Sequence, residues 1–214
     1  MDKIIDSNIG TTCLPQQRKT DQKKLNQPPG QHNDKRILTL LSKDATMEQG
    51  FRLLMEAYQE RLYWHVRRMV HDHEDANDVL QNCFVKVYRG IRKFEGKSKL
   101  YTWLYRIATN EAITFMNKEK QKTTTSIDSE ENSLSNQLKA DPYFDGDEIQ
   151  TWLKVAIGKL PEKQQLVFNL RYFDEMSYAD MSEMLDTSQG ALKASFHHAV
   201  KKIEKYVKSA AGGA

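Results

Sequence analysis

The segment Tyr101–Asn110, with the sequence YTWLYRIATN, combines aromatic, basic and amide side chains. The rings can stack on an unpaired base, the cations can hold its phosphates, and the amide can read the edge of the base. A loop with a central glycine, Phe94–Ser98, comes just before this segment. The combination is typical of a site for single-stranded nucleic acid, and Phe94 beside Gly96 predicts one wall of a pocket for an extruded base.

A helix core is the alternative interpretation of the same aromatic residues. Trp103 and Ile107 stand four residues apart and would share one buried face of a helix, which is the simpler interpretation for these two. Asn110 is different, because an amide within a packed helix needs a hydrogen-bond partner, and a base edge would serve. The predicted single-strand site comprises Phe94, Gly96, Lys97, Ser98, Lys99, Tyr101, Trp103, Arg106 and Asn110.

A second candidate site lies near the C-terminus. A short helix (Ser177–Leu185), a turn (Asp186–Ser188) and a longer basic helix from about Gln189 to Val207 predict a helix-turn-helix. The core stripe of the last helix is predicted to be Leu192, Phe196, Ala199, Ile203 and Val207. The opposite face predicts contacts to duplex DNA through Gln189, Gly190, Lys193, Ala194, His197, His198 and Lys201. A small helical bundle whose basic face is merely solvated is the alternative that spacing leaves open.

The helix predicted to start near Asp75 carries polar and apolar residues side by side. Asp75, Asp78 and Gln81 share a polar face, with Val79 and Phe84 nearby. Acidic residues near a helix N-terminus also suit the macrodipole, so a solvated face explains them equally well.

Metal binding is not favoured. His71 and His73 flank an aspartate, but no partner pair stands elsewhere at ligand spacing. The neighbours His197 and His198 would point about a hundred degrees apart on a helix. We expect no metal and no cofactor.

The elements that position these residues are all predicted to be helices, because β-branched residues fall on helical stripes. Thr46 resembles the N-cap of a long helix, and a third helix is predicted from about Leu100 to Lys118. The 214 residues are 39% apolar and 29% charged, which fits two small cores. Residues 47–122 carry 14 basic and 10 acidic side chains, whereas residues 123–150 carry 1 and 7.

These patterns predict an all-α protein of two small helical domains joined by a flexible acidic linker. The predicted parts are a disordered N-terminal extension (1–34), a first domain (35–122), the linker (123–146), a helix-turn-helix domain (147–208) and a flexible tail (209–214).

The remaining sequence features bear on compartment and chemistry. Cys13 and Cys83 cannot form a disulfide framework, no apolar run reaches the ~18 residues of a membrane span, and the N-terminus lacks a signal-peptide core. We therefore predict a cytoplasmic protein. No carboxylate cluster, nucleophile–base pair or phosphate-binding glycine loop is present, so we do not expect an enzyme.

Ordered segments of this chain resemble the extracytoplasmic-function (ECF) group of the bacterial sigma-70 family, over residues 35–120 and 147–208. The segments are His73–Gln81, Phe84–Tyr88, Tyr101–Asn110, Leu160–Pro161, Leu170–Phe173, Ser177–Tyr178 and Gly190–Lys193. The resemblance implies a sigma factor that binds core RNA polymerase and directs promoter recognition, DNA melting and transcription initiation. The alternative is a helix-turn-helix regulator that binds duplex DNA without polymerase docking, which leaves the aromatic loop and the acidic linker unexplained.

The resemblance also implies roles for individual positions. The single-strand site corresponds to minus-10 recognition, the last helix to minus-35 recognition, and the acidic linker to a segment that threads the active-site channel of the polymerase. The polymerase-docking residues would be Asp75, Asp78, Val79, Gln81, Asn82 and Phe84. Expected partners are the clamp helices of the largest polymerase subunit, the flap of the second large subunit, promoter DNA and an anti-sigma factor. Ser195, His198 and Val200 stand at positions that are often basic in the family.

Overall fold

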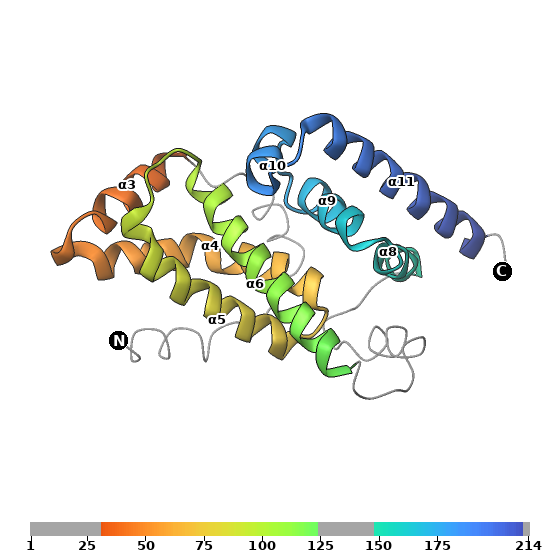
Figure 1. The fold of residues 1–214 in the computed structure, drawn as a ribbon, viewed down its shortest axis with the longest axis horizontal. Helices are drawn as coiled ribbons and strands as arrows, with labels where there is room; N and C mark the ends of the chain where they lie inside the picture. The colour runs from red at the N-terminus through yellow and green to blue at the C-terminus, as the bar shows by residue number, and fades with distance from the viewer. Residues whose placement is uncertain (1–30, 124–147, 212–214) are drawn as a thin grey trace. The chain divides into compact units, whose positions relative to one another are not determined.

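The computed structural model describes residues 31–123 and 148–211, and every regular element in these two ranges is helical. The elements are α3 (Gln31–Leu41), η1 (Asp44–Thr46), α4 (Met47–Val70), α5 (His73–Gly90), η2 (Ile91–Lys93), α6 (Leu100–Thr123), α8 (Glu148–Gly158), α9 (Glu162–Tyr172), α10 (Tyr178–Leu185) and α11 (Gln189–Ala211), shown in Figure 1. The predicted all-α fold is confirmed. The chain forms two compact units, the first of residues up to Asn117 and the second of most residues after it.

The first unit has its core between α3, α4, α5 and α6. The buried ring of Phe51 on α4 meets two rings of α5 edge to face, with centroids 6.3 Å from Phe84 and 5.0 Å from Tyr88. Such edge-to-face pairs add to the free energy gained by burying apolar surface. The buried face of α4 therefore packs on α5.

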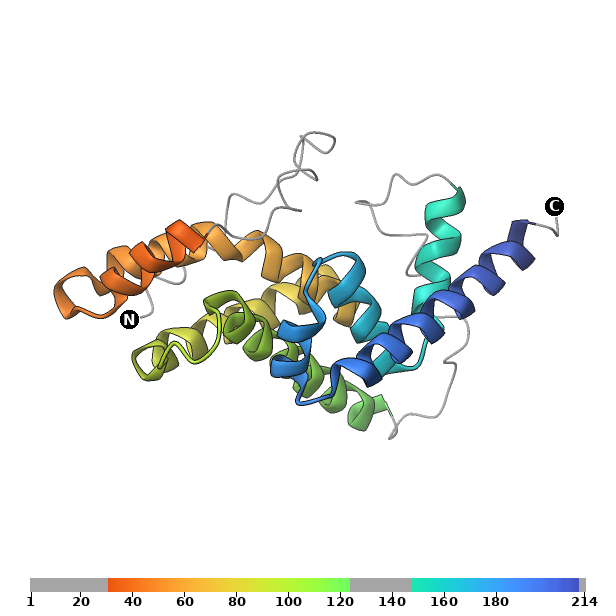
Figure 2. The ribbon, with the colours of Figure 1, turned by 90° about the horizontal axis from the view of Figure 1, so that it is seen from above.

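The helix α3 lies side by side with α4 (Figures 1 and 2). Close packing and one partly buried hydrogen bond join the two helices. A Cβ atom added to Gly50 would lie 2.9 Å from both Leu40 Cβ and Leu41 N, so glycine permits the helices to meet. The hydroxyl of Tyr58 donates to Asp34 Oδ1 at 2.5 Å. Burial and then this hydrogen bond raise the pKa of Tyr58, which keeps the hydroxyl protonated as a donor.

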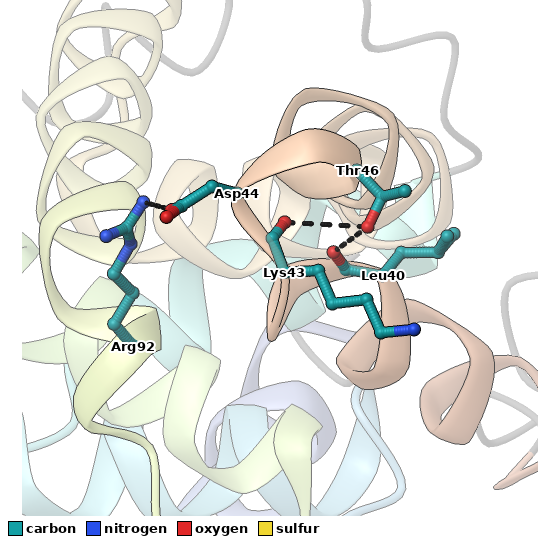
Figure 3. A network of polar contacts seen from close by, with 5 residues as sticks. All are labelled: Leu40, Lys43, Asp44, Thr46 and Arg92. Atoms are coloured by element: carbon teal, nitrogen blue, oxygen red, sulfur yellow. Dashed lines mark hydrogen bonds and ion pairs between the residues drawn. The ribbon is translucent and has the colours of Figure 1, made fainter.

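The turn between α3 and α4 uses its polar side chains differently from the prediction (Figure 3). Thr46 stands before α4, but its hydroxyl makes no cap. It donates instead to the carbonyl oxygens of Leu40 at 2.7 Å and Lys43 at 3.5 Å. Thr46 therefore occupies the predicted N-cap position of α4 but makes no capping hydrogen bond, because its hydroxyl donates to the carbonyl oxygens of the turn. Arg92 of η2 forms an ion pair with Asp44 across the same turn.

The corner between α4 and α5 is closed by two consecutive residues. His71 ends α4 in the left-handed conformation, with φ of 66°. Asp72 is the N-cap of α5 and accepts hydrogen bonds from the backbone N–H groups of Asp75 at 3.1 Å and Glu74 at 2.8 Å. These hydrogen bonds, that from Asp75 first, lower the pKa of Asp72. The helix therefore begins at His73, slightly before the predicted start.

The second unit packs α8, α9 and α11 around a small apolar core. The core comprises Ala156, Ile157, Leu160, Phe168, Ala199 and Ile203. The ring of Phe168 is stacked between Tyr172 at 5.1 Å and Phe196 at 5.7 Å. In α11, Leu192, Ala199 and Ile203 are buried, and Phe196 and Val207 pack against the core. The predicted core stripe of the last helix is confirmed.

The helix-turn-helix is formed by α10 and α11. Ser177 caps α10, because its hydroxyl oxygen accepts from Asp180 N at 3.1 Å and its hydroxyl donates to Asp180 Oδ2 at 2.6 Å. Asp186 ends α10 in the left-handed conformation, and Ser188 Oγ accepts from Ala191 N at 3.3 Å at the start of α11. The polar residues of the predicted turn thus end one helix and begin the next.

Several predicted boundaries change. The disorder predicted for residues 1–34 is wrong for residues 31–34, which begin α3, and α6 continues to Thr123 rather than ending at Lys118. Residues 1–30, 212–214 and the predicted linker from residue 124 on lie outside the described residues. In the described ranges, no helix combines the length and apolar content required to cross a membrane.

Candidate nucleic-acid and polymerase interfaces

The loop before α6 and the first turns of that helix form a corner, residues 94–110, which we call the loop–helix corner. Gly96 has a φ of +69°, in the region that favours glycine, and a Cβ added to it would meet nothing within 4 Å. Lys97 beside it is 85% exposed and forms an ion pair with Glu95. The loop therefore presents open backbone at Gly96 and an exposed cation at Lys97.

The aromatic residues of the loop–helix corner also contact one another. Phe94 and Trp103 are half-buried, with centroids 5.2 Å apart and ring planes at 50°. The indole also packs on α5, 3.4 Å from the Cβ that Gly90 would carry. Packing accounts for Trp103, as the simpler interpretation predicted. Tyr101 is half-buried as well, with Lys99 Nζ 5.6 Å from its ring centroid.

Arg106 and Asn110 lie one turn apart on the exposed side of α6. Asn110 was predicted to lie within the packed part of the helix, which is wrong, because its side chain is exposed. The buried polar residue is its neighbour Thr109, which pairs with His65 Nε2 of α4 at 2.9 Å. His65 is fully buried, and its ring lies 4.9 Å from Tyr105. The sequence gives no signal for this pair, which joins residues far apart in the chain.

A cavity of about 480 Å³ opens beside the loop, but its walls differ from those predicted. Phe94 and Gly96 line it, whereas Lys97, Ser98 and Asn110 do not. The remaining walls come from the end of α3, the turn shown in Figure 3, and η2: Leu38, Leu41, Ser42, Asp44, Ile91, Arg92 and Glu95. The cavity therefore includes the wall predicted from Phe94 and Gly96, but not Lys97, Ser98 or Asn110 of the predicted single-strand site.

The polymerase-docking prediction for α5 divides into an exposed and a buried part. Asp78 and Asn82 are exposed one turn apart, and Asp75 and Gln81 are half-buried. We call these four residues the docking face, after the polymerase contact that is predicted for them. Val79 and Phe84 are 2% and 0% exposed within the core. Their predicted contact with the polymerase is corrected to a supporting role beneath the docking face.

All residues predicted to contact duplex DNA are exposed on α11. This recognition face consists of Gln189, Gly190, Lys193, Ala194, His197, His198 and Lys201. A Cβ added to Gly190 would meet nothing within 4 Å, so the start of the helix is open to a close approach. The rings of His197 and His198 have centroids 6.2 Å apart and are tilted by 55°.

An aromatic residue that was not among the predicted contacts, Tyr178, lies beside Lys193 of this face. The ring of Tyr178, at the start of α10, has Arg171 Cζ 5.3 Å and Lys193 Nζ 5.8 Å from its centroid. Arg171 also donates from Nη1 to the carbonyl oxygen of Met176 at 3.3 Å. Only the position of Tyr178 after the capping Ser177 could have drawn attention to it.

Two further chemical features concern metals and thiols. Among the side chains that the structure describes, no group of three His, Cys, Asp or Glu residues could hold a metal ion. Burial raises the pKa of the Cys83 thiol to about 12, so this thiol stays protonated and unreactive at neutral pH.

Two family models match the chain: Sigma-70 region 2 over residues 54–122, and Sigma-70, region 4 over residues 150–203. RNA polymerase sigma-H factor of Pseudomonas aeruginosa is 31% identical over 166 residues, 74% of this chain and 86% of that protein. ECF RNA polymerase sigma factor SigW of Bacillus subtilis is 28% identical over 169 residues, 75% of this chain and 90% of that protein. The chain belongs to the ECF group of the sigma-70 family.

Two solved structures share its fold. The sigma factor RpoE of Bartonella quintana, in complex with the anti-sigma factor NepR, has a TM-score of 0.62 at 21% identity and covers 75% of this chain and 98% of that one. CnrH, in complex with the cytosolic domain of CnrY, has a TM-score of 0.62 at 16% identity, over 83% of this chain and 98% of that one.

This sigma factor is therefore a transcription initiation factor that brings core RNA polymerase to promoters, as the sequence predicted. Sigma factors are not enzymes by themselves. The region 2 match contains the docking face and the loop–helix corner, and the region 4 match contains α9, α10 and the recognition face. The roles of individual residues on these surfaces stay predictions.

Proposed function

We propose that the two units divide promoter recognition by the state of the DNA strand. The first domain, residues 35–122, captures the minus-10 element as single strand at the loop–helix corner. The second, residues 147–208, holds the minus-35 element as duplex on the recognition face. The observation that carries this proposal is the exposure of all seven recognition-face residues, opposite a stripe that is fully used by the core.

At the loop–helix corner, the exposed Asn110 amide reads a base edge and Arg106 meets its phosphate. Phe94 and Tyr101 offer half-buried rings to the base, while Lys97, Ser98 and Lys99 follow the backbone from the open turn at Gly96. Trp103 packs against the ring of Phe94 and supports it.

The docking face of α5 is proposed to bind the clamp helices of the largest polymerase subunit. Asp78 and Asn82 supply exposed contacts, and the capped start of the helix fixes their orientation. The second domain contacts the flap of the second large subunit. The acidic segment 123–146 threads the active-site channel, where its negative charge suits a positively lined path that RNA later occupies.

The proposed setting follows from these partners. The protein acts in the cytoplasm, where polymerase and chromosome are found, and it has no catalytic activity of its own. Of the two solved structures with the same fold, the sigma factor RpoE is in complex with the anti-sigma factor NepR, and CnrH is in complex with the cytosolic domain of CnrY. We propose that an anti-sigma factor of comparable kind also holds this chain inactive.

Run-off transcription with host core polymerase tests the proposal. The full chain is added to core enzyme and a pool of host genomic fragments, and the transcripts are mapped by sequencing. The expected result is a set of start sites that share upstream minus-35 and minus-10 elements and vanish without the chain. Binding to duplex fragments without any polymerase-dependent transcript would overturn the proposal in favour of a conventional regulator.

A further inference from the structure

One tyrosine of the second unit gathers cations from two different helices. The ring of Tyr178, the first residue of α10, lies within the ~6 Å range of cation–π attraction from Arg171 of α9 and Lys193 of α11. Both cations therefore lie at one end of the helix-turn-helix, next to the first residue of α10.

The ring is held in place by its surroundings. The Ser177 hydroxyl caps α10 by accepting from Asp180 N and also donates to the Asp180 carboxylate, which fixes the backbone at Tyr178. Arg171 is fixed by its hydrogen bond to the Met176 carbonyl. Tyr178 and Arg171 are half-buried, whereas Lys193 is exposed. Lys193 is thus the only exposed residue of these three, and attraction to the Tyr178 ring limits the positions that its ammonium group takes.

Arg171 and Lys193 place two positive charges beside the Tyr178 ring, and this arrangement favours binding of an anion. Within the described residues, neither Arg171 nor Lys193 is paired with a carboxylate. Two cations drawn to one ring repel each other, and the ring offsets only part of that repulsion. A phosphate that approaches both would relieve it.

The place of Tyr178 in the motif indicates which anion. In a helix-turn-helix the first helix crosses the DNA backbone, while the second enters the major groove. An ammonium group over the first residue of α10 therefore lies where the backbone passes rather than over the groove floor. His197, one turn further along α11, stays on the exposed side of that helix.

We propose that Tyr178 is a positioning residue that holds Lys193 as a backbone-phosphate contact of the minus-35 duplex. Base reading is left to the rest of the recognition face, His197 included. Sequence alone leaves Lys193 free to meet either a base edge or a phosphate. The inference rests on the proposed minus-35 function of the second domain.

The test is a double-mutant cycle in the reconstituted holoenzyme, on a promoter fragment recovered from the run-off experiment. Affinity is measured between about 50 and 200 mM salt for wild type, Tyr178→Leu, Lys193→Gln and the double variant. Tyr178→Phe keeps the ring and should therefore bind with wild-type affinity. Tyr206→Leu is the matched control, because Lys159 Nζ lies 4.5 Å from that ring, away from the recognition face.

The expected result has three parts. Tyr178→Leu weakens binding about two- to fivefold, the range of one exposed cation–π contact. It has no further effect once Lys193→Gln is present. Lys193→Gln lowers the salt slope by about 1 and weakens binding equally across a panel of single base-pair changes in the minus-35 element.

Three outcomes would overturn the inference: additive losses in the double variant, full affinity of Tyr178→Leu, or a Lys193→Gln loss confined to particular base pairs. Thermal melting of each variant checks folding. Should Tyr178→Leu not fold, Tyr178→Met removes the ring at similar volume and carries the same expectation. A wild-type holoenzyme that recognises no promoter fails the proposed function instead, which separates the two failures.

Discussion

The two regions proposed to bind DNA combine buried and exposed side chains in different ways. On α11, buried and exposed side chains lie on opposite sides of one helix, so no residue of the recognition face also belongs to the core. At the loop–helix corner they alternate, and Phe94 and Trp103 pack on each other within the proposed site. Binding and stability are therefore separable in the second unit and coupled in the first.

The largest expected effect concerns α5, in which buried core residues lie beneath the docking face. Phe84→Ala removes a fully buried ring that packs on Phe51 and should cost about 3–5 kcal/mol of unfolding free energy. The double substitution of Asp78 and Asn82 by alanine should change stability by less than about 1 kcal/mol and yet weaken polymerase binding. Urea unfolding and a polymerase pull-down measure the two effects. Normal polymerase affinity of the double variant would reduce the docking face to a solvated surface.

The next effect separates two residues of the loop–helix corner. Asn110→Ala and Phe94→Ala should both reduce capture of single-stranded minus-10 DNA, Phe94 by the ~1–3 kcal/mol of a lost stacking ring. Only Phe94→Ala should also lower stability, because Asn110 is exposed. Permanganate footprinting of the open complex reports melting, and minus-35 duplex binding is the control that should not change. Normal melting by both variants would remove them from the site.

A smaller effect tests whether DNA binding and stability are separable on α11. Lys193→Glu combined with Lys201→Glu should weaken minus-35 duplex binding more than about tenfold and lower the salt slope by about 2. Thermal stability should stay within about 0.5 kcal/mol of wild type, because both side chains are exposed. Lys159→Glu with Lys163→Glu is the charge-matched control. A comparable loss of affinity in that control would show a general charge effect rather than a defined face.

The smallest effect concerns the cap that orients the docking face. Asp72→Ala should cost about 0.5–2 kcal/mol at pH 7, whereas Asp72→Asn keeps an acceptor and should cost less. The folded pKa of Asp72 is lowered, so this contribution is present above its unfolded pKa and is lost as pH falls through the folded value. The stability difference between wild type and Asp72→Ala should therefore shrink below about pH 4. A constant difference across that range would contradict a charged cap.

The helices and the recognition face followed from the sequence because they depend on local periodicity. Leu192, Ala199 and Ile203 recur at helical steps, and the side opposite such a stripe is necessarily exposed. Residues whose roles depend on distant partners could not be found in this way. His65 is one example, since nothing in the sequence pairs it with Thr109.

At other positions, predictions made from residue type or from resemblance differ from the structure. Thr46 has the residue type of an N-cap, yet the Leu40 carbonyl competes successfully for its hydroxyl. Val79 and Phe84 were placed on a binding surface by resemblance alone, which cannot tell a contact residue from the core residue beneath it. Asn110 was selected by the opposite error, an assumption of burial for an exposed amide.

The attachment of α3 bears on where the first unit begins as an independently folding piece of chain. The region 2 match starts at Leu54, well after α3 and the contacts of Gly50. A fragment cut at Leu54 would leave the Tyr58 hydroxyl without its acceptor Asp34 and uncover the apolar side chains that α3 shields. The family match and the independently folding unit thus begin at different residues of this chain. The shortest fragment expected to fold begins no later than Gln31.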